Sequence, residues 1–367
     1  MTRFLLVAVL SLFLSCDKIN DLPPIGVPDL NDDLYFPSVN SENWETTTAA
    51  ELEWNTEQLN DLSNFLEDNG TRAFIVLKDG KIVIEEYWGE NILRTAPFTQ
   101  SSSWYWASAG KTLTAFLAGL AQQEGLLNIQ DKTSDYLGEN WTSMPLEKEN
   151  LITIRHQLTM TTGLDFTNGV LGCTDPECLT YKADAGTQWF YYNAPYTLLS
   201  GVIANAAGVS YNQFTNDQLG SKIGMGGTWR EKDYNNVYWS TARDAARFGL
   251  LVLNKGKWGK TDILTDKNYY NDMVTTSQDF NPSYGYLWWL NGKEEVILPS
   301  FTEPLSTSIA PNAPEDLFAA MGKNGQFIDV VPSQNLVVVR MGEAPDESFV
   351  PAQFHDAMWE RIGEMIE

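Results

Sequence analysis

Ser108 and Lys111 lie three residues apart, at the start of a stretch with helical spacing of apolar residues. Residues three apart share one face of a helix, so the lysine amine would lie one turn beyond the serine hydroxyl. Such an amine can lower the pKa of a neighbouring base or take the hydroxyl proton itself. The free N–H groups of a helix N-terminus add partial positive charge near the serine. We therefore predict that Ser108 is a nucleophile and that Lys111 activates it.

The Ser-x-x-Lys spacing alone does not identify a catalytic serine. A serine in this position can simply cap a helix, and Ser15 to Lys18 has the same spacing. A second motif, Tyr191-Tyr192-Asn193, supplies further functional groups, because residues two apart in an extended segment point to the same side. We predict that the Tyr191 phenol acts as a general base and that the Asn193 amide holds the substrate.

Tyr-x-Asn also occurs at Tyr234–Asn236 and at Tyr269–Asn271. Only the first motif follows Ala185-Gly186-Thr187 and precedes an apolar helical stretch over residues 198–207. We interpret the other two as surface-loop segments.

Other catalytic constellations lack the residues that they need. His156 and His355 are the only histidines, and neither a Gly-x-Ser-x-Gly nor a His-Glu-x-x-His sequence occurs. Gly110-Lys111-Thr112 matches the end of a phosphate-binding loop, but Tyr105 stands where that loop needs glycine. We expect no metal ion and no organic cofactor.

The composition is that of a large, acidic, folded protein. The 367 residues are 43% hydrophobic and 12% aromatic, which allows a sizeable core and is unlike a disordered chain. A formal net charge of −24 repels phosphate, so nucleic acid is excluded as a partner. We interpret the charge as favouring solubility, and its alternative is a preference for cationic substrates. We expect a monomer.

The N-terminal residues indicate export. Arg3 precedes an apolar run over residues 4–14, which is short for a bilayer span but fits a signal peptide. Ser15-Cys16 resembles the cleavage box of bacterial lipoproteins, in which the cysteine is lipidated, and an ordinary signal peptide is the alternative. We expect a lipoprotein signal peptide over residues 1–16 and a proline-containing tether over 17–45. The protein would then be extracytoplasmic, anchored through Cys16 in the bacterial periplasm or outer membrane.

Cys173 and Cys178 are the two remaining cysteines, with Asp175-Pro176 between them. Asp-Pro favours a turn, and in an oxidising compartment we expect a local disulfide. A metal site is the alternative, but this segment contains no histidine.

Strand patterns lie at both ends of the chain and helical patterns fill its middle. Residues 73–77 and 81–87 flank an Asp-Gly turn, which predicts a β-hairpin. Strand patterns return at 284–290, 317–321, 326–331 and 336–341, and a closing amphipathic helix is predicted over 349–366. We expect one domain over 46–367, with an α/β part from about 46–110 and 255–367 and a helical part over about 111–254.

Several segments, taken in order, resemble the serine β-lactamase and penicillin-binding protein superfamily, and in particular its class C-like branch of esterases, peptidases and amide hydrolases. The resemblance covers about residues 55–365. The segments that carry it are Ala107–Lys111, Glu124–Leu127 with Asp131 and Asp135–Leu137, Ile152–Leu164, Ala185–Thr187 with Tyr191–Asn193, Ser240–Asp244 with Arg247–Gly249, and Gly325–Val339.

The resemblance implies an α/β (α+β) fold, in which helices flank an antiparallel sheet and an all-helical domain lies beside it. It also implies a Lys-Thr-Gly motif on a strand facing the serine, where this chain has Ala320-Met321-Gly322. The glycine remains where backbone must approach substrate closely. The lysine, which helps bind the substrate carboxylate in β-lactamases, is missing. The resemblance therefore implies ester or amide substrates, with the N–H groups of Ser108 and Lys323 as the oxyanion hole.

The predicted activity is hydrolysis of a carboxylic ester or amide through an acyl-enzyme on Ser108, with Lys111 or Tyr191 as the base. One alternative is a DD-peptidase or β-lactamase that acts on cell-wall peptides or lactams. Another is a lipoprotein that keeps the pocket but only binds peptidoglycan or peptide.

Overall fold

The structure, a computed structural model, describes residues 34–167 and 171–366, which belong to one compact unit, Asp33–Glu367. The predicted signal peptide, the lipidation site Cys16 and the first part of the tether lie outside the described residues. Within the described ranges, no helix combines the length and the apolar character that crossing a bilayer requires.

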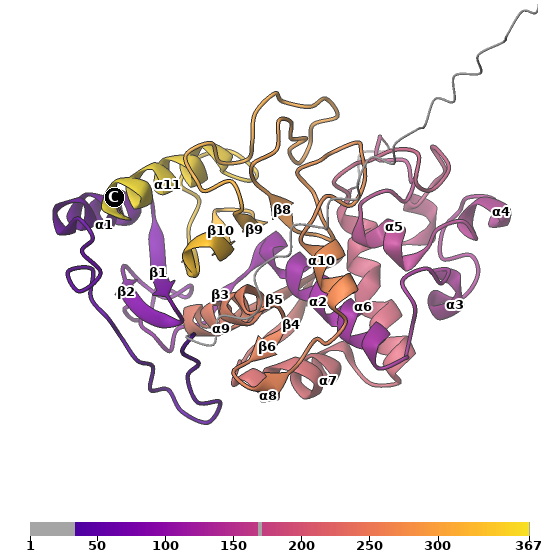
Figure 1. Cartoon of the computed structure of the whole chain (residues 1–367). Coiled ribbons are helices and arrows are strands. Elements are labelled where there is room, and N and C mark those ends of the chain that lie inside the picture. Colours follow the sequence, from indigo (N-terminus) through magenta and orange to yellow (C-terminus); the bar gives the residue numbers. More distant parts are fainter. Residues whose placement is uncertain (1–33, 168–170, 367) are drawn as a thin grey trace, which may run out of the picture. The chain divides into compact units, whose positions relative to one another are not determined.

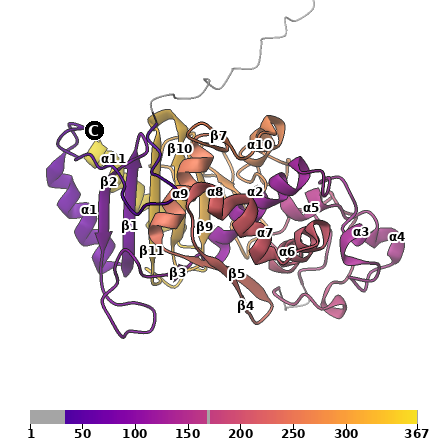
Figure 2. The same cartoon turned by 90° about the horizontal axis from the view of Figure 1, so that it is seen from below.

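A six-stranded antiparallel sheet has the strand order β2-β1-β11-β10-β9-β8 (Figures 1 and 2). Its strands come from both ends of the chain, as the sequence predicted. They are β1 (Thr71–Lys78), β2 (Lys81–Tyr87), β8 (Trp289–Leu290), β9 (Phe318–Gly322), β10 (Gln326–Val331) and β11 (Leu336–Gly342).

Two turns with left-handed residues connect neighbouring strands of this sheet. Asp79 and Gly80, with φ of 51° and 81°, join β1 to β2 and confirm the predicted hairpin. Asn324 and Gly325, with φ of 65° and 74°, lie in the turn from β9 to β10. Asn, Asp and Gly tolerate this region of backbone space better than other residues do. The second turn begins at Lys323, which the sequence analysis assigned to the oxyanion hole.

Helices cover both faces of the sheet. On one face, Gly249 of α9 (Ala242–Leu253) lies against Ile328 and Val337. On the other face, α11 (Ala352–Ile366) contacts β10 through Asp329, since successive strand residues point to opposite faces. With both faces covered, every residue of β11 is buried, which explains its nearly continuous apolar sequence.

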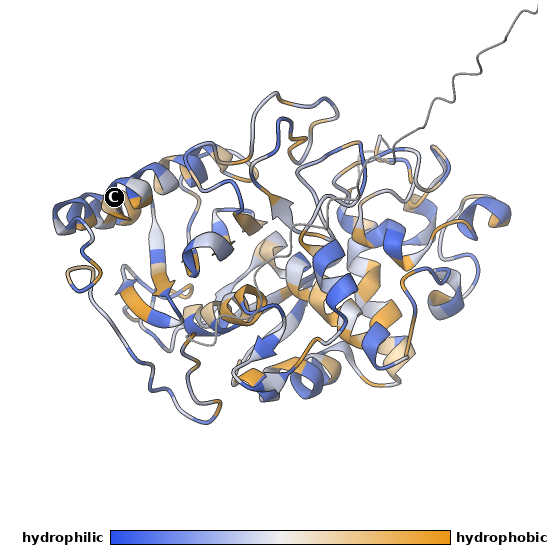
Figure 3. Cartoon of the chain, in the orientation of Figure 1, coloured by the Kyte–Doolittle hydropathy of each residue, from blue (hydrophilic) through white to orange (hydrophobic). Residues whose placement is uncertain are grey.

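The amphipathic helix predicted at the C-terminus is confirmed. The buried residues of α11 recur at helical spacing and include Phe354, Met358 and Ile362. Figure 3 shows polar and apolar residues alternating along this helix. α11 packs beside α1 (Thr56–Asp68), so the first and the last helix of the described chain lie together.

The other helices are mostly short and lie beside the sheet (Figure 2). They are α2 (Gly110–Gln123), α3 (Ser134–Leu137), α4 (Leu146–Glu149), α5 (Ile154–Leu158), α6 (Asn193–Ala207), α7 (Tyr211–Thr215), α8 (Ser221–Ile223) and α10 (Lys267–Met273). α2 contacts both β9 and α6, and its residues Gly110–Ala121 are all buried. The helix that follows Ser108 is therefore fixed between the sheet and the helical part. The predicted fold class, a mixed α/β fold with an antiparallel sheet, is confirmed.

The middle of the chain, 111–254, is less uniformly helical than predicted. It contains the hairpin of β4 (Thr228–Lys232) and β5 (Asn235–Ser240), and β5 also pairs with β3 (Trp104–Tyr105). The cross-strand partners Trp229 and Tyr238 are both buried, with ring centroids 5.0 Å apart, and this aromatic pair stabilises the hairpin.

The strand predicted over 284–290 is wrong for most of its length. Only Trp289 and Leu290 form β8, because the chain bends at Leu287, which has a φ of 61°. A separate two-stranded sheet consists of β6 (Lys257–Trp258) and β7 (Thr261–Asp262).

Residues 34–45, which we assigned to the tether, pack against the folded unit. The Trp44 side chain is 8% exposed, and its Nε1–H donates to the Gly80 carbonyl at 2.7 Å. The Tyr35 N–H donates to the Asp79 carbonyl at 3.0 Å. The proline-based boundary at residue 45 therefore lies too far along the chain, because an aromatic anchor precedes it.

The predicted disulfide between Cys173 and Cys178 is present, with an S–S distance of 2.04 Å. It closes a short loop in the helical part of the chain.

Candidate active site

Ser108 lies in a 3₁₀ turn, Ala107–Ala109, directly before α2. Ala107 has a φ of 47°, a strained conformation for a residue with a side chain. Trp106 holds this turn from behind: its N–H donates to the Tyr238 carbonyl at 2.9 Å and its Nε1–H to Ser240 Oγ at 2.8 Å. The strain therefore persists because buried contacts fix both ends of the turn.

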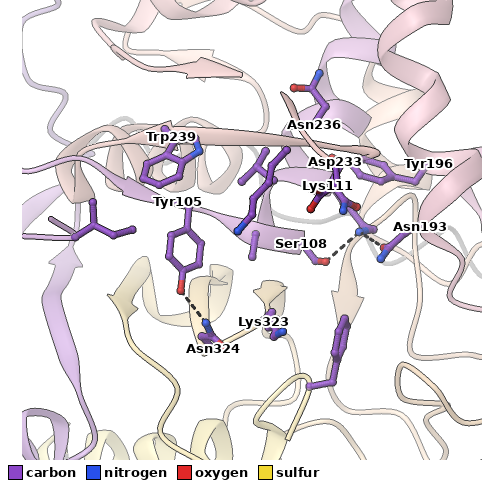
Figure 4. Close-up of a pocket in the computed structure, with 16 residues that line it drawn as sticks. Tyr105, Ser108, Lys111, Asn193, Tyr196, Asp233, Asn236, Trp239, Lys323 and Asn324 are labelled. Atoms are coloured by element: carbon purple, nitrogen blue, oxygen red, sulfur yellow. Dashed lines mark hydrogen bonds between the residues drawn. The ribbon is translucent and has the colours of Figure 1, made fainter. Parts of the chain in front are cut away.

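Lys111 lies one helical turn beyond Ser108, as the spacing predicted. Its Nζ donates hydrogen bonds to Ser108 Oγ at 3.0 Å and to Asn193 Oδ1 at 2.8 Å (Figure 4). The lysine residue is only 3% exposed, and burial lowers the pKa of its amine to about 7. No carboxylate forms a salt bridge with this amine in the described part of the chain. The amine is therefore neutral in a large fraction of molecules near neutral pH.

Aromatic rings enclose the Lys111 amine. Its Nζ lies 4.2 Å from the Tyr196 ring centroid and 5.0 Å from the Tyr191 ring centroid. The Tyr191 ring stacks on Trp289 at 5.6 Å, and Tyr284 lies edge-on to both rings. These rings exclude water from the amine, which is the physical cause of its lowered pKa.

The Tyr191 hydroxyl is buried beside the Ser108 hydroxyl, although it forms no hydrogen bond of standard geometry with the described residues. Burial raises its pKa far above the ordinary value for a phenol, although the neighbouring Ser108 hydroxyl partly offsets this effect. Tyr191 thus lies beside Ser108 as expected, but its phenol stays protonated. The hydrogen bond of standard geometry to Ser108 Oγ comes from Lys111.

Gly322 brings β9 against the 3₁₀ turn Ala107–Ala109, which contains Ser108. A Cβ at this position would lie 2.5 Å from the Trp106 carbonyl oxygen and 3.2 Å from the Ser108 nitrogen, so a larger residue would displace the turn. Lys323 follows directly, which places its backbone next to that of Ser108. The ammonium of Lys323 is 5.6 Å from the Phe349 ring centroid.

Ser108, Lys111, Asn193 and Lys323 line one pocket of about 460 Å³ (Figure 4). Tyr191 and Gly322 lie behind its wall. Other lining residues come from β3, the 3₁₀ turn, α6, the β4–β5 hairpin, the β9–β10 turn and two loops: Ile92, Tyr105, Ala107, Tyr196, Lys232, Asp233, Asn235, Asn236, Val237, Trp239, Asn324 and Phe349.

The aromatic residues beside the motifs divide into wall and core. Tyr105 lines the pocket, and its hydroxyl accepts a hydrogen bond from Asn324 Nδ2 at 2.7 Å. Trp104, Trp106 and Trp189 are instead buried in the core. The signal that separates them is strand alternation, because Tyr105 points away from the face on which Trp104 and Trp106 lie.

Sequence reasoning missed the contribution of the β4–β5 hairpin. Asn235 and Asn236 line the pocket, although we interpreted Tyr234–Asn236 as a surface loop. Tyr234 itself is exposed, with its hydroxyl donating to Asp175 at 2.7 Å. Tyr196 was also missed, and its position five residues after Tyr191, in the first turns of α6, was an available signal.

The two histidines lie away from this pocket. His156 forms a capping box with Thr153 at the start of α5. His355 is buried, and its Nε2 lies 2.8 Å from Asp329 Oδ2, which also accepts from Trp359. No group of three His, Cys, Asp or Glu side chains that could hold a metal ion occurs among the described residues.

Comparisons with known proteins identify a family and related folds. The model of the Beta-lactamase family matches residues 66–352. An uncharacterized protein of Alkalihalophilus pseudofirmus is 26% identical over 311 residues, which cover 76% of this chain and 85% of that protein.

Two solved structures share the fold. One is named "Putative 6-aminohexanoate-dimer hydrolase from Bacillus anthracis"; it has a TM-score of 0.67 and 18% identity and covers 91% of this chain and 89% of that chain. The other is EstCE1, a hydrolase with promiscuous acyltransferase activity. It has a TM-score of 0.62 and 14% identity, and it covers 86% of this chain and 99% of that chain. The match of the family model over most of the chain shows that this protein belongs to the beta-lactamase family and has its serine-hydrolase fold.

Proposed function

We propose that the protein hydrolyses carboxylic esters or amides through an acyl-enzyme formed on Ser108. The observation that carries this proposal is the contact of 3.0 Å between Ser108 Oγ and the buried amine of Lys111. An amine with a pKa of about 7 is free to accept a proton at neutral pH, which an ordinary lysine is not. A screen of short acyl esters, amides and nitrocefin tests the proposal, and the absence of turnover on every substrate would contradict it.

In the proposed first step, neutral Lys111 takes the Ser108 proton while the serine oxygen attacks the carbonyl carbon. The N–H groups of Ser108 and Lys323 stabilise the negative charge on the carbonyl oxygen, which is typically worth about 3–4 kcal/mol per donor. The proton then passes from Lys111, through the protonated Tyr191 hydroxyl beside Ser108, to the leaving alcohol or amine. In the second half of the reaction, water takes the place of the serine as the attacking group and the serine oxygen becomes the leaving group, so the acyl group is released as a carboxylic acid.

This assignment gives the first proton transfer to Lys111 rather than to Tyr191. The Tyr191 pKa is raised by burial, so its phenolate is scarce at neutral pH. Asn193 Oδ1 holds the amine in place from the other side at 2.8 Å. Tyr191 keeps a role as proton relay.

We expect kcat/KM to increase with pH up to about 7 and to level off above it. The catalytic form of Lys111 is the neutral amine, and its lowered pKa places the transition near neutrality. Below that pH the rate should fall about tenfold per unit. A pH profile of initial rates with a neutral ester measures this, and a rate that decreases between pH 6 and 8 would contradict the role of Lys111 as base.

The pocket walls favour a substrate with an apolar group. Tyr105, Val237 and Trp239 line the cleft that holds Ser108, and Ala320 replaces the lysine that serves carboxylate binding in β-lactamases. The names of the two structural neighbours, an amide hydrolase and a hydrolase with acyltransferase activity, fit an ester or amide substrate.

Trp239→Ala should reduce selectivity for longer acyl chains. The indole offers apolar surface, and each buried methylene is worth about 0.8 kcal/mol. Loss of its contact with about two methylenes of the chain should therefore lower the hexanoate-to-acetate ratio of kcat/KM about tenfold. p-Nitrophenyl acetate and hexanoate, compared in the same variant, provide the internal control. An unchanged ratio would show that the acyl chain binds elsewhere.

We also propose that the protein is exported and lipid-anchored at Cys16. The disulfide between Cys173 and Cys178 supports an oxidising compartment. Incorporation of labelled palmitate by the wild type and its loss in Cys16→Ala would agree with this proposal, whereas an unlabelled wild type would contradict it.

A further inference from the structure

Arg340 on β11 is a buried cation whose polar contacts all go to uncharged oxygen atoms. The side chain has no exposed surface, and burial lowers its pKa to about 9, so it remains charged at neutral pH. Its Nη1 donates to the carbonyls of Asn324 at 2.7 Å and Gly325 at 2.9 Å. Its Nη2 donates to the carbonyls of Asn69 and Glu343, and its Nε donates to Thr71 Oγ1. A buried charge is costly unless such contacts compensate it.

Two of these contacts fix the turn that follows Gly322. Gly325, held by Arg340 through its carbonyl, donates its own N–H to the Gly322 carbonyl at 3.2 Å. The Gly322 carbonyl and the Lys323 N–H belong to one trans peptide, in which the two bonds point in opposite directions. Holding the carbonyl toward the turn therefore directs the Lys323 N–H away from it. That N–H has no hydrogen-bond acceptor among the described residues.

Gln326 restrains the same turn from its other end. Its Nε2 donates to the carbonyls of Lys323 and Asn324 at 3.3 and 3.1 Å, and to the Gly342 carbonyl at 2.7 Å. The side chain is 2% exposed and carries no charge. Two buried side chains thus fix the carbonyl groups of the turn, while its free N–H directly follows Gly322, which lies against the backbone of Ser108.

We propose that Arg340 is a positioning residue for the oxyanion hole. Its guanidinium holds the β9–β10 turn so that the Lys323 N–H stays aligned with the Ser108 N–H when charge develops on the carbonyl oxygen. This inference rests on the proposed function. According to this inference, Arg340 affects the stability of the transition state and not the binding of the substrate.

Arg247 on α9 provides a matched control. It is 5% exposed, and it too donates to backbone carbonyls, those of Ile223 at 2.9 Å and of Ser38 and Ser41 at 3.1 Å. Its guanidinium lies over aromatic rings, as that of Arg340 lies over Phe354. None of its acceptors belongs to the pocket, so it reports the cost of losing a buried arginine without a change at the oxyanion hole.

The experiment compares Arg340→Lys with Arg247→Lys, with kcat and KM measured for an ester well below each melting temperature. We expect kcat of Arg340→Lys to fall about 10- to 100-fold with KM within threefold of the wild type, because a displaced donor acts on the transition state. The affinity of a boronic acid that forms a tetrahedral adduct on Ser108 should fall in parallel. Arg247→Lys should change kcat by less than threefold.

Gln326→Met keeps the test valid if the Arg340 variant does not fold. It removes two bonds to the turn without removing a charge, so kcat should again fall while KM changes little. The inference would be overturned if the Arg340 and Arg247 variants lost kcat equally. It would also be overturned if kcat were unchanged in Arg340→Lys or in Gln326→Met. Either outcome would leave the proposed function standing. A wild type that neither hydrolyses esters nor binds the boronic acid would overturn the proposed function and this inference with it.

Discussion

Ser108→Ala is expected to lower ester hydrolysis by about 10⁴-fold or more while leaving the fold intact. In the proposed mechanism the serine oxygen forms the acyl bond, and alanine has no oxygen to take its place. Lys111 keeps its hydrogen bond to Asn193 in this variant, so the buried amine retains a partner. Steady-state rates with p-nitrophenyl butyrate measure the loss, and a thermal melt verifies that the protein is folded.

Ser103→Ala is the matched control for this variant. Ser103 is exposed and lies just before β3, five residues upstream of Ser108, and it does not line the pocket. We expect its activity to equal that of the wild type. If Ser108→Ala retained the wild-type rate, catalysis by this serine would be ruled out.

Lys111→Met is expected to abolish turnover and, at the same time, to stabilise the protein at mildly acidic pH. The folded pKa of about 7 lies below the ordinary lysine pKa of 10.5, so between these values the unfolded chain binds more protons. The stability of the wild type must then increase with pH across this window, and below pH 7 the full cost of the buried amine is present. That cost is on the order of 5 kcal/mol, partly offset by the two hydrogen bonds of the amine.

The methionine variant has no amine to desolvate and therefore lacks this pH dependence. We expect Lys111→Met to be more stable than the wild type by about 2–3 kcal/mol at pH 6, and the difference to vanish by about pH 9. Urea unfolding of both proteins at the two pH values measures it. The measured quantity is the free energy of unfolding of Lys111→Met minus that of the wild type. If this difference were smaller at pH 6 than at pH 9, the buried amine would not be neutral. Such an outcome would remove the proposed base.

The residues whose roles depend on local spacing were predictable from the sequence. Lys111 contacts Ser108 because a helix places residues three apart on one face, and the Asp79-Gly80 turn forms the expected hairpin. The approach of Gly322 to the 3₁₀ turn that contains Ser108 also agrees with its place in the implied third motif.

Features that depend on contacts between distant segments could not be predicted. The pKa of Lys111 depends on the rings of Tyr191 and Tyr196, which come from another part of the chain. The absence of a hydrogen bond of standard geometry for the Tyr191 hydroxyl among the described residues likewise follows only from packing. Arg340 gave no sequence signal, since its acceptors are backbone carbonyls that any residue carries.

Covalent labelling with a fluorophosphonate, followed by mass spectrometry of the intact protein and of its peptides, tests most directly whether Ser108 is the nucleophile. If it is, one equivalent of label attaches to the peptide containing Ser108, Ser103→Ala labels like the wild type, and Ser108→Ala stays unlabelled. A label on another residue, one that survives Ser108→Ala, or an unlabelled wild type would contradict the proposed acyl-enzyme mechanism.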